Sequence, residues 1–228
     1  MMTRALLAVG APEVFADVPT RAVAGEPALV VLPPPERNLA QSLAQALMRR
    51  RSARSYTSQP VALAAVSQLL WAAQGITAAG GRRTAPSAGA LYPLELHVVA
   101  VRVEGLVSGV YRYLPDSHSL RPAIGETVVL ALSRAAFSQQ AVADAAAVFV
   151  IAAVEERTAH KYGVRAGRYV AFEAGAASQS LALQAAAQGL GTVVIGAFDD
   201  LAVARVLGLA PGERPLVLMP VGSSSYTR

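Results

Sequence analysis

The chain has 228 residues, of which 54% are hydrophobic and 15% are charged, so one domain with a large core is expected and intrinsic disorder is excluded. It contains no cysteine, which excludes disulfide bonds, thiolate catalysis and cysteine-ligated metal centres. The net charge is +5, and 19 arginines accompany a single lysine, Lys161. A GC-rich coding sequence is the simplest explanation of this arginine bias.

A pI near 10 raises the question of nucleic-acid binding. The densest basic run, residues 49–51 with Arg54, has no interleaved aromatic residues, and aromatic residues make up only 6% of the chain. A solvated face or a local anion site is therefore the better interpretation. No nucleic acid is expected among the partners.

Residues 170–190 are the stretch long enough to span a membrane. Glu173, Ser180 and Gln184 fall on one narrow polar stripe at helical spacing, which is typical of a buried helix in a water-soluble protein. The apolar stretch at residues 5–11 is short for a signal-peptide core. We therefore expect a cytoplasmic protein without a membrane partner.

The first third of the chain predicts an arm followed by two helices. Residues 1–37 hold six prolines between positions 12 and 37 and are interpreted as an N-terminal extended arm, with the main domain at 38–228. Asn38 is the expected cap of a helix that ends near Arg50. The remaining elements of this third are an extended segment at 52–56, a helix from Pro60 to Gly75 and a Gly-rich stretch at 76–90.

The rest of the chain mixes strands and helices without a strict repeat, which predicts an α+β fold rather than a doubly wound sheet. The expected strands are 94–103, 110–114, 147–154, 192–195 and 216–221. The expected helices are 127–137, the long helix 170–190 and 201–207, with a polar, charged segment at 155–168.

Several common catalytic motifs are absent. The single lysine is not part of a P-loop, no GxGxxG follows a strand, and HExxH and GxSxG do not occur. The three histidines are scattered, so no metal site is expected. If the chain is an enzyme, a cofactor is expected to carry its chemistry.

Arg50, Ser52 and Arg54 alternate with a period of two directly after the first predicted helix. In an extended segment this spacing places two guanidinium groups and a hydroxyl on one face. Guanidinium groups match the geometry of a phosphate, so an anion site is one interpretation. Arginines that complement the helix dipole are the alternative.

Short motifs continue from this segment in a fixed order. They are RRSARSY at 50–56, LLWAAQG at 69–75, RTAPSAGALYPLE at 83–95, GVYRY at 109–113, KYG at 161–163, EAG at 173–175, GLG at 189–191 and GAFD at 196–199. Together they resemble the nitroreductase superfamily of FMN flavoproteins, in particular the SagB-type dehydrogenases that include azoline oxidases. The resemblance spans about residues 38–222.

The resemblance implies a nitroreductase-like α+β fold, with a mixed central sheet flanked by helices and a homodimer that binds FMN at its interface. The FMN phosphate and ribityl ligands that it implies are Arg50, Arg51, Ser52 and Arg54, with Arg228 as a terminal phosphate ligand. A frayed terminus is the alternative for Arg228.

Two further segments have an implied cofactor contact. The loop that approaches the flavin from the partner subunit corresponds to Pro86, Ser87, Ala88, Gly89 and Leu91. The strand end whose backbone N–H meets flavin N5 corresponds to Ile195, Gly196 and Ala197. An ordinary strand-to-helix turn is the alternative for these three residues.

The KYG motif implies that Lys161 and Tyr162 transfer a proton while flavin N5 takes a hydride. Lysine serves as a base only where burial or positive neighbours lower its pKa. Arginine could not substitute, because it does not deprotonate in proteins. A solvated surface lysine is the alternative interpretation.

Three activities remain open at this stage. SagB-type oxidation of a thiazoline or oxazoline competes with NAD(P)H-driven reduction of a nitro compound or quinone, and a non-catalytic flavin-binding scaffold of a modification complex is the alternative to both. Many SagB-type relatives carry His and Asn where this chain has Ala176 and Ser180. Nitroreductases proper carry a Glu where this chain has Gly196, which moves the chain away from enzymes specialised for nitroaromatic compounds.

Overall fold

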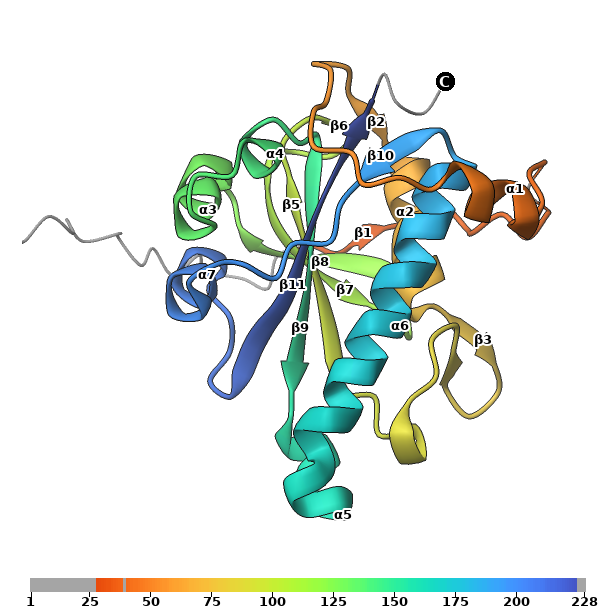
Figure 1. Cartoon of the computed structure of the whole chain (residues 1–228), viewed down its shortest axis with the longest axis vertical. Helices are drawn as coiled ribbons and strands as arrows, with labels where there is room; N and C mark the ends of the chain where they lie inside the picture. Colours follow the sequence, from red (N-terminus) through yellow and green to blue (C-terminus); the bar gives the residue numbers. More distant parts are fainter. Residues whose placement is uncertain (1–27, 39, 225–228) are drawn as a thin grey trace, which may run out of the picture.

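A seven-stranded sheet forms the centre of the computed structural model, which describes residues 28–38 and 40–224 (Figure 1). Its strand order is β1-β8-β7-β5-β9-β11-β10. The strands are β1 (Val30–Val31), β5 (Leu94–Ala100), β7 (Gly109–Leu114), β8 (Ser119–Ile124), β9 (Ala147–Val154), β10 (Leu190–Thr192) and β11 (Glu213–Ser223). All ladders between these named strands are antiparallel.

Parallel pairing occurs outside those ladders. An isolated bridge joins Ser52 to Thr192 in β10, so the parallel component of the expected mixed sheet lies at one edge. A separate parallel pair is formed by β2 (Val61–Ala62) and β6 (Val103–Glu104), and β3 (Ile76–Ala78) pairs antiparallel with β4 (Arg82–Arg83).

Helices cover both faces of the central sheet, which confirms the predicted α+β class (Figure 1). One core lies under α2 (Leu63–Gln74) and α6 (Ala166–Ala187), and the other under α3 (Val129–Ala135), α4 (Gln140–Ala143) and α7 (Asp200–Leu207). Alternation along β5 divides its side chains between the two cores, with Val98 in the first and Val99 in the second.

The 22-residue helix α6 runs along the molecule for about 33 Å, at 1.5 Å per residue. It begins and ends a few residues earlier than the predicted 170–190, and it is rich in alanine, whose small side chain allows close packing. None of the helices in the described residues is long and apolar enough to cross a membrane.

Several predicted boundaries are wrong. Helix α1 (Leu43–Arg49) is capped by Ser42 and not by Asn38, because Ser42 and Gln45 form a reciprocal capping box. The polar segment 155–168 is largely helical, with α5 (Glu156–Tyr162) and the 3₁₀ turn η2 (Gly163–Arg165) ahead of α6.

Two strand predictions also need correction, and one strand is missing from the prediction. The predicted strand 94–103 is divided into β5 and β6. The predicted strand 192–195 leaves the sheet after Thr192, and Ile195 rejoins it through a bridge to Leu218. Strand β8 was not predicted, and it contains Pro122, a residue that usually argues against a strand.

The described end of the predicted arm, residues 28–37, lies against the domain. Strand β1 pairs with β8, and the Ser67 hydroxyl donates a hydrogen bond to the Pro33 carbonyl at 2.6 Å. The Glu36 amide donates to the Gln68 side-chain oxygen at 2.8 Å, and the Gln68 amide returns a bond to the Glu36 carbonyl at 3.0 Å. Residues 1–27 lie outside the described part of the chain.

Candidate functional site

The predicted anion segment lies beside β10 at one edge of the sheet. Ala53 is buried, and its amide donates to the Thr192 carbonyl at 2.9 Å, whereas Ser52 and Arg54 are exposed. Exposed and buried side chains therefore alternate along the segment, as expected of an extended chain. None of the ion pairs among the described residues involves Arg50 or Arg54, so both guanidinium groups are available to an anion.

Arg51 has a different role in the described structure. Its guanidinium donates to the carbonyl oxygens of Met48 at 3.1 Å and of Arg50 at 2.9 Å. These carbonyls lie at the C-terminal end of α1, where the last helical oxygens lack partners within the helix. Arg51 thus closes a helix end, which distinguishes it from its two basic neighbours.

The segment around Gly196 presents backbone donors to open space. Ile195 exchanges two 2.9 Å hydrogen bonds with Leu218, which fixes the start of the segment. The amides of Gly196 and Ala197 then form no hydrogen bond with any described residue. A Cβ placed on Gly196 would meet nothing within 4 Å, so a ligand can approach this backbone closely.

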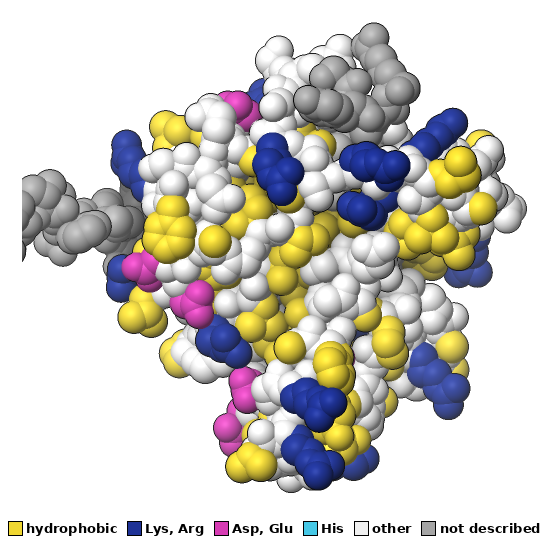
Figure 2. Space-filling view, viewed as in Figure 1, with side chains coloured by type: hydrophobic (Ala, Val, Ile, Leu, Met, Phe, Trp, Pro, Cys, Tyr) yellow, Lys and Arg dark blue, Asp and Glu magenta, His cyan; other side chains and the backbone are white. Residues whose placement is uncertain are grey.

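A cavity of about 360 Å³ adjoins this segment. It lies between α6 and β11, and its lining is mostly apolar, with Ala171, Ala174, Gly175, Ser178, Gln179, Val194, Leu216 and Val217. Figure 2 shows the same face, where an apolar band lies between two groups of Lys and Arg side chains. A volume in the range of 300–1,000 Å³ is typical of small-molecule sites.

The second predicted cluster is built on a strained loop around η1 (Ala88–Ala90). Gly89, Ala90 and Tyr92 have φ values of 62°, 54° and 45°, a region that L-residues other than Gly rarely adopt. The Ser87 hydroxyl accepts a hydrogen bond from the Tyr92 amide at 2.8 Å. The Glu173 carboxylate on α6 accepts one from the Ala88 amide, also at 2.8 Å.

Burial raises the pKa of Glu173 above its ordinary value, while the Ala88 amide and the Ser87 side chain act in the opposite direction. The sequence placed Glu173 in a motif without giving it a role. In the structure it holds the loop against α6.

Lys161 and Tyr162 lie against this loop at the end of α5. A Cβ placed on Gly89 would be 3.0 Å from both Lys161 Nζ and Tyr162 Oη. The Lys161 side chain is exposed, and the Tyr162 ring packs on the Tyr169 ring with centroids 4.7 Å apart. The structure therefore brings together the two predicted catalytic residues and the glycine of the predicted flavin loop.

An ion-pair network supports the same cluster. The Glu95 carboxylate binds Arg157 at 2.6 Å and Arg112 at 2.8 Å, and the Arg157 guanidinium also donates to the Tyr92 carbonyl at 3.1 Å. Glu95 and Arg112 lie in the motifs at 83–95 and 109–113, but the sequence gives neither of them, nor Arg157, a role. The contacts join β5, β7 and α5, so only the fold reveals them.

The predicted anion segment and the Lys161 cluster lie toward opposite ends of α6 within one chain, and the cavity beside Val194 lies against the middle of this helix, at residues 171–179. Figure 1 shows α1 and β10 near the C-terminal end of this helix and α5 at its N-terminal end. Arg228, the last predicted ligand, lies outside the described residues. Within one copy of the chain, the predicted phosphate ligands therefore lie apart from the predicted catalytic residues.

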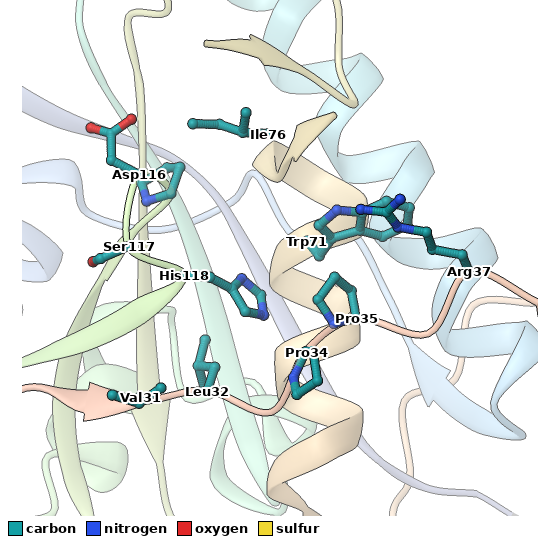
Figure 3. A pocket seen from close by; sticks show the side chains of 11 residues that line it. Val31, Leu32, Pro34, Pro35, Arg37, Trp71, Ile76, Asp116, Ser117 and His118 are labelled. Atoms are coloured by element: carbon teal, nitrogen blue, oxygen red, sulfur yellow. The ribbon is translucent and has the colours of Figure 1, made fainter. Parts of the chain in front are cut away.

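A larger pocket of about 390 Å³ lies elsewhere and contains none of the predicted site residues. Figure 3 shows Pro34, Pro35, Trp71 and His118 around it. His118 Nδ1 lies 2.9 Å from the Tyr113 hydroxyl, and its Nε2 lies 2.7 Å from the Ser67 hydroxyl. Both ring nitrogens are used within the protein, so we assign this histidine a structural role.

Comparison with known proteins identifies the family of the chain and agrees with its fold. Residues 47–223 match the model of the Nitroreductase family. A candidate nitroreductase from Methanocaldococcus jannaschii is 45% identical over 180 residues, which is 79% of this chain and 90% of that protein. The chain belongs to the nitroreductase family and has the oxidoreductase class of that family.

Solved structures share the fold. A candidate nitroreductase from Ralstonia eutropha JMP134 superposes with a TM-score of 0.76 at 27% identity and covers 93% of this chain and 97% of that one. A chain of the Escherichia coli microcin synthetase McbBCD complex, solved with truncated pro-MccB17 bound, has a TM-score of 0.67 at 24% identity. That match covers 90% of this chain and 79% of the other, and it shows the fold alone.

Proposed function

We propose that the chain is an FMN-dependent oxidoreductase of the SagB type that oxidises thiazoline or oxazoline rings in a peptide. The observation that carries this proposal is the convergence of Lys161 and Tyr162 on Gly89. A basic amine and a phenol beside a loop with an accessible backbone suit the removal of a proton from carbon.

The described residues fit FMN at the other cluster. Arg50, Ser52 and Arg54 would bind its phosphate, and the open amides of Gly196 and Ala197 would face the flavin ring beside the cavity under Val194. At most about 14 Å of chain separates Thr192 from Gly196, at 3.3–3.6 Å per residue. When bound there, FMN would supply the hydride acceptor of the reaction.

A homodimer would complete the site. A two-fold axis that pairs two α6 helices antiparallel brings the Lys161 cluster of one copy to the Gly196 cluster of the other. Large apolar side chains are exposed on the elements concerned, with Met48 76%, Phe172 60% and Val194 52% accessible in the single chain. Such side chains favour an interface over contact with water.

In this reaction the chain's own groups handle the proton. The Lys161 amine accepts the proton lost from one ring carbon, and the hydride from the neighbouring ring carbon would go to the cofactor. The ring C–C single bond thereby becomes a double bond, and an azole is formed. The Tyr162 hydroxyl, next to Gly89, donates a hydrogen bond to the substrate and orients it against Lys161.

The first test combines a spectrum with one substitution. We expect the purified chain, reconstituted with FMN, to show a bound-flavin visible spectrum, and we expect Lys161→Ala to lose azoline oxidation by a factor on the order of 10²–10⁴, the usual contribution of a general base. Oxidation of an azoline-containing peptide is followed by mass spectrometry.

The same variant separates the competing activities. NAD(P)H-driven turnover needs no carbon base, so it should largely survive in Lys161→Ala while azoline oxidation is lost. A wild-type enzyme that reduces quinones with NAD(P)H and leaves the azoline-containing peptide unchanged would refute azoline oxidation. Bound FMN that neither reductants nor azolines reduce would indicate a scaffold instead.

A further inference from the structure

The position of Lys161 depends on how α5 is held. This helix has only seven residues, and Thr158 is its buried residue, so it is too short to be stable through its own hydrogen bonds. Lys161 and Tyr162 form its last turn, and Gly163 ends it with a φ of 52°. Contacts to the rest of the fold must therefore fix the two side chains.

Two arginine contacts hold the start of α5 and the residue before it. Arg157 reaches Glu95 in β5 at 2.6 Å and the Tyr92 carbonyl at 3.1 Å. Glu155 pairs with Arg214 in β11 at 3.4 Å, and both of these side chains are about half exposed. An exposed pair at that distance contributes little, so the Arg157 contact is the stronger of the two.

Arg157 also lies on the helix face that carries Lys161. The two residues are four positions apart, which places their side chains one turn apart on the same side of α5. The Tyr92 carbonyl that Arg157 binds belongs to the same strained loop as Gly89, where an added Cβ would lie 3.0 Å from Lys161 Nζ. The Arg157 guanidinium thus connects α5, which carries Lys161, to the loop that contains Gly89.

Glu95 is oriented from its other side by Arg112, which lies on the neighbouring strand β7 at 2.8 Å. The carboxylate therefore has one oxygen for each arginine, and the planar fork of Arg157 spans a carboxylate and a carbonyl at once. A lysine at position 157 could not reproduce this geometry, since its ammonium is a point charge on a flexible stem.

We propose that Arg157 is a positioning residue for Lys161, and that Glu95, held by Arg112, is its anchor. The guanidinium fixes α5 and the 87–92 loop relative to each other, so that Lys161 Nζ and Tyr162 Oη stay beside Gly89. This inference rests on the proposed function, in which Lys161 is the base.

The test compares Arg157→Ala and Glu95→Gln with Arg214→Gln, which removes the other tie of this segment. With FMN-loaded full-length protein, we expect kcat for azoline oxidation to fall on the order of 10- to 100-fold in the first two variants, because a displacement of about 1 Å in a reacting group has effects of that size. KM and the Kd for FMN should stay at the wild-type values. Arg214→Gln should keep wild-type kcat.

Two further measurements separate positioning from a general loss of structure. Millimolar methylguanidine should restore part of the activity of Arg157→Ala and none of that of Lys161→Ala. Because Lys161 is the only lysine, its modification by trinitrobenzenesulfonate can be followed by mass spectrometry without any substrate. We expect its rate to rise several-fold in Arg157→Ala and Glu95→Gln.

Wild-type kcat together with wild-type labelling in Arg157→Ala and Glu95→Gln would overturn the inference. An equal loss of kcat in Arg214→Gln would overturn it as well. Removal of any contact to this segment would then lower kcat, and Arg157 would have no special role. A fully active Lys161→Ala would instead remove the proposed function, and the labelling rates would still show whether Arg157 places the amine.

Discussion

The loop from Ser87 to Tyr92 concentrates backbone strain in a few residues. Ala90 and Tyr92 occupy the left-handed region beside Gly89, and such conformations cost about 1–3 kcal/mol each. They persist where surrounding contacts fix them, and here Glu173 binds one end of the loop and Arg157 the other. The strain therefore coincides with the candidate catalytic cluster.

Gly89→Ala tests this coincidence. The new Cβ would lie 3.0 Å from Lys161 Nζ and Tyr162 Oη, and its positive φ would cost about 1–2 kcal/mol for an L-residue. We expect the free energy of unfolding in urea to fall by about that amount, and azoline oxidation to fall further than FMN binding does.

Gly125→Ala is the matched control, because its Cβ would meet nothing within 4 Å and its φ is not positive. An equal loss of stability in both variants would show that the Gly89 conformation is not a constraint.

At this scale the sequence is informative only where residues are close along the chain. Gly89 and Lys161 are found because each lies in a short motif. The pairing of Arg157 with Glu95 spans 62 positions, and no local pattern encodes it. Burial and register of three different elements decide that contact, so it could not be predicted from propensities.

Among the elements, the segment 28–37 is held by side chains of the domain as well as by its own strand pairing. Strand β1 has two residues, whereas His118 and Ser67 both contact the Pro33 carbonyl. Burial lowers the pKa of His118 below its ordinary value near 6.5. The folded state therefore favours the neutral ring, whose Nδ1 accepts from the Tyr113 hydroxyl.

This shift predicts that acid loosens the segment. The stabilisation is complete above about pH 6.5, where unfolded histidine is neutral, and it is lost as the pH falls through the lower folded pKa. Trp71, the only tryptophan, lines the pocket that Pro34 and Pro35 close, so its emission should shift to longer wavelength on acidification.

His118→Phe should remove this transition, whereas His160→Gln, at an exposed histidine on α5, should leave it in place. A transition that survives in His118→Phe would assign it to another group.

The predictions of secondary-structure elements are wrong where two local sequence signals disagree and the weaker one is followed. Ser42 with Gln45 is a readable capping box, yet Asn38 was preferred as the cap. Residues 155–168 were interpreted by their charge, although α5 needs only one buried side chain, Thr158, and a support from outside the helix. Strand β8 is missed because Pro122 argues against a strand. The strand forms nevertheless, because β1 and β7 pair with it on its two sides.

For the whole molecule, the separation of the two clusters along α6 is the main result. The fold class followed from the mixture of elements, but the placement of the predicted anion segment and of Lys161 toward opposite ends of one helix is a property of the folded chain. Neither place holds the predicted phosphate ligands, the open amides and the predicted base together. The proposed dimer accounts for this division.

Phe172→Glu tests the dimer. This side chain is 60% exposed in the single chain, and a carboxylate in an apolar interface would lose its hydration without a partner. We expect the variant to sediment as a monomer in analytical ultracentrifugation at micromolar concentration, where the wild type is a dimer, and to bind FMN more weakly.

Val107→Glu is the control, since Val107 is 76% exposed and lies between β6 and β7 rather than on α6. A monomeric wild type, or an equal effect of both substitutions, would contradict the proposed interface.

Both edges of the central sheet pair a segment from early in the chain with a strand that is synthesised much later. β1 closes one edge, and the Ser52 bridge lies beside β10 at the other, so residues made early in synthesis complete both sides. Their partners, β8 and β10, leave the ribosome much later. The N-terminal segments stay unpaired until β8 and β10 have been synthesised. Pairing between segments so far apart in the chain makes folding slow. Truncation before residue 190 would therefore leave an early segment exposed to aggregation, even with most of the sheet already synthesised.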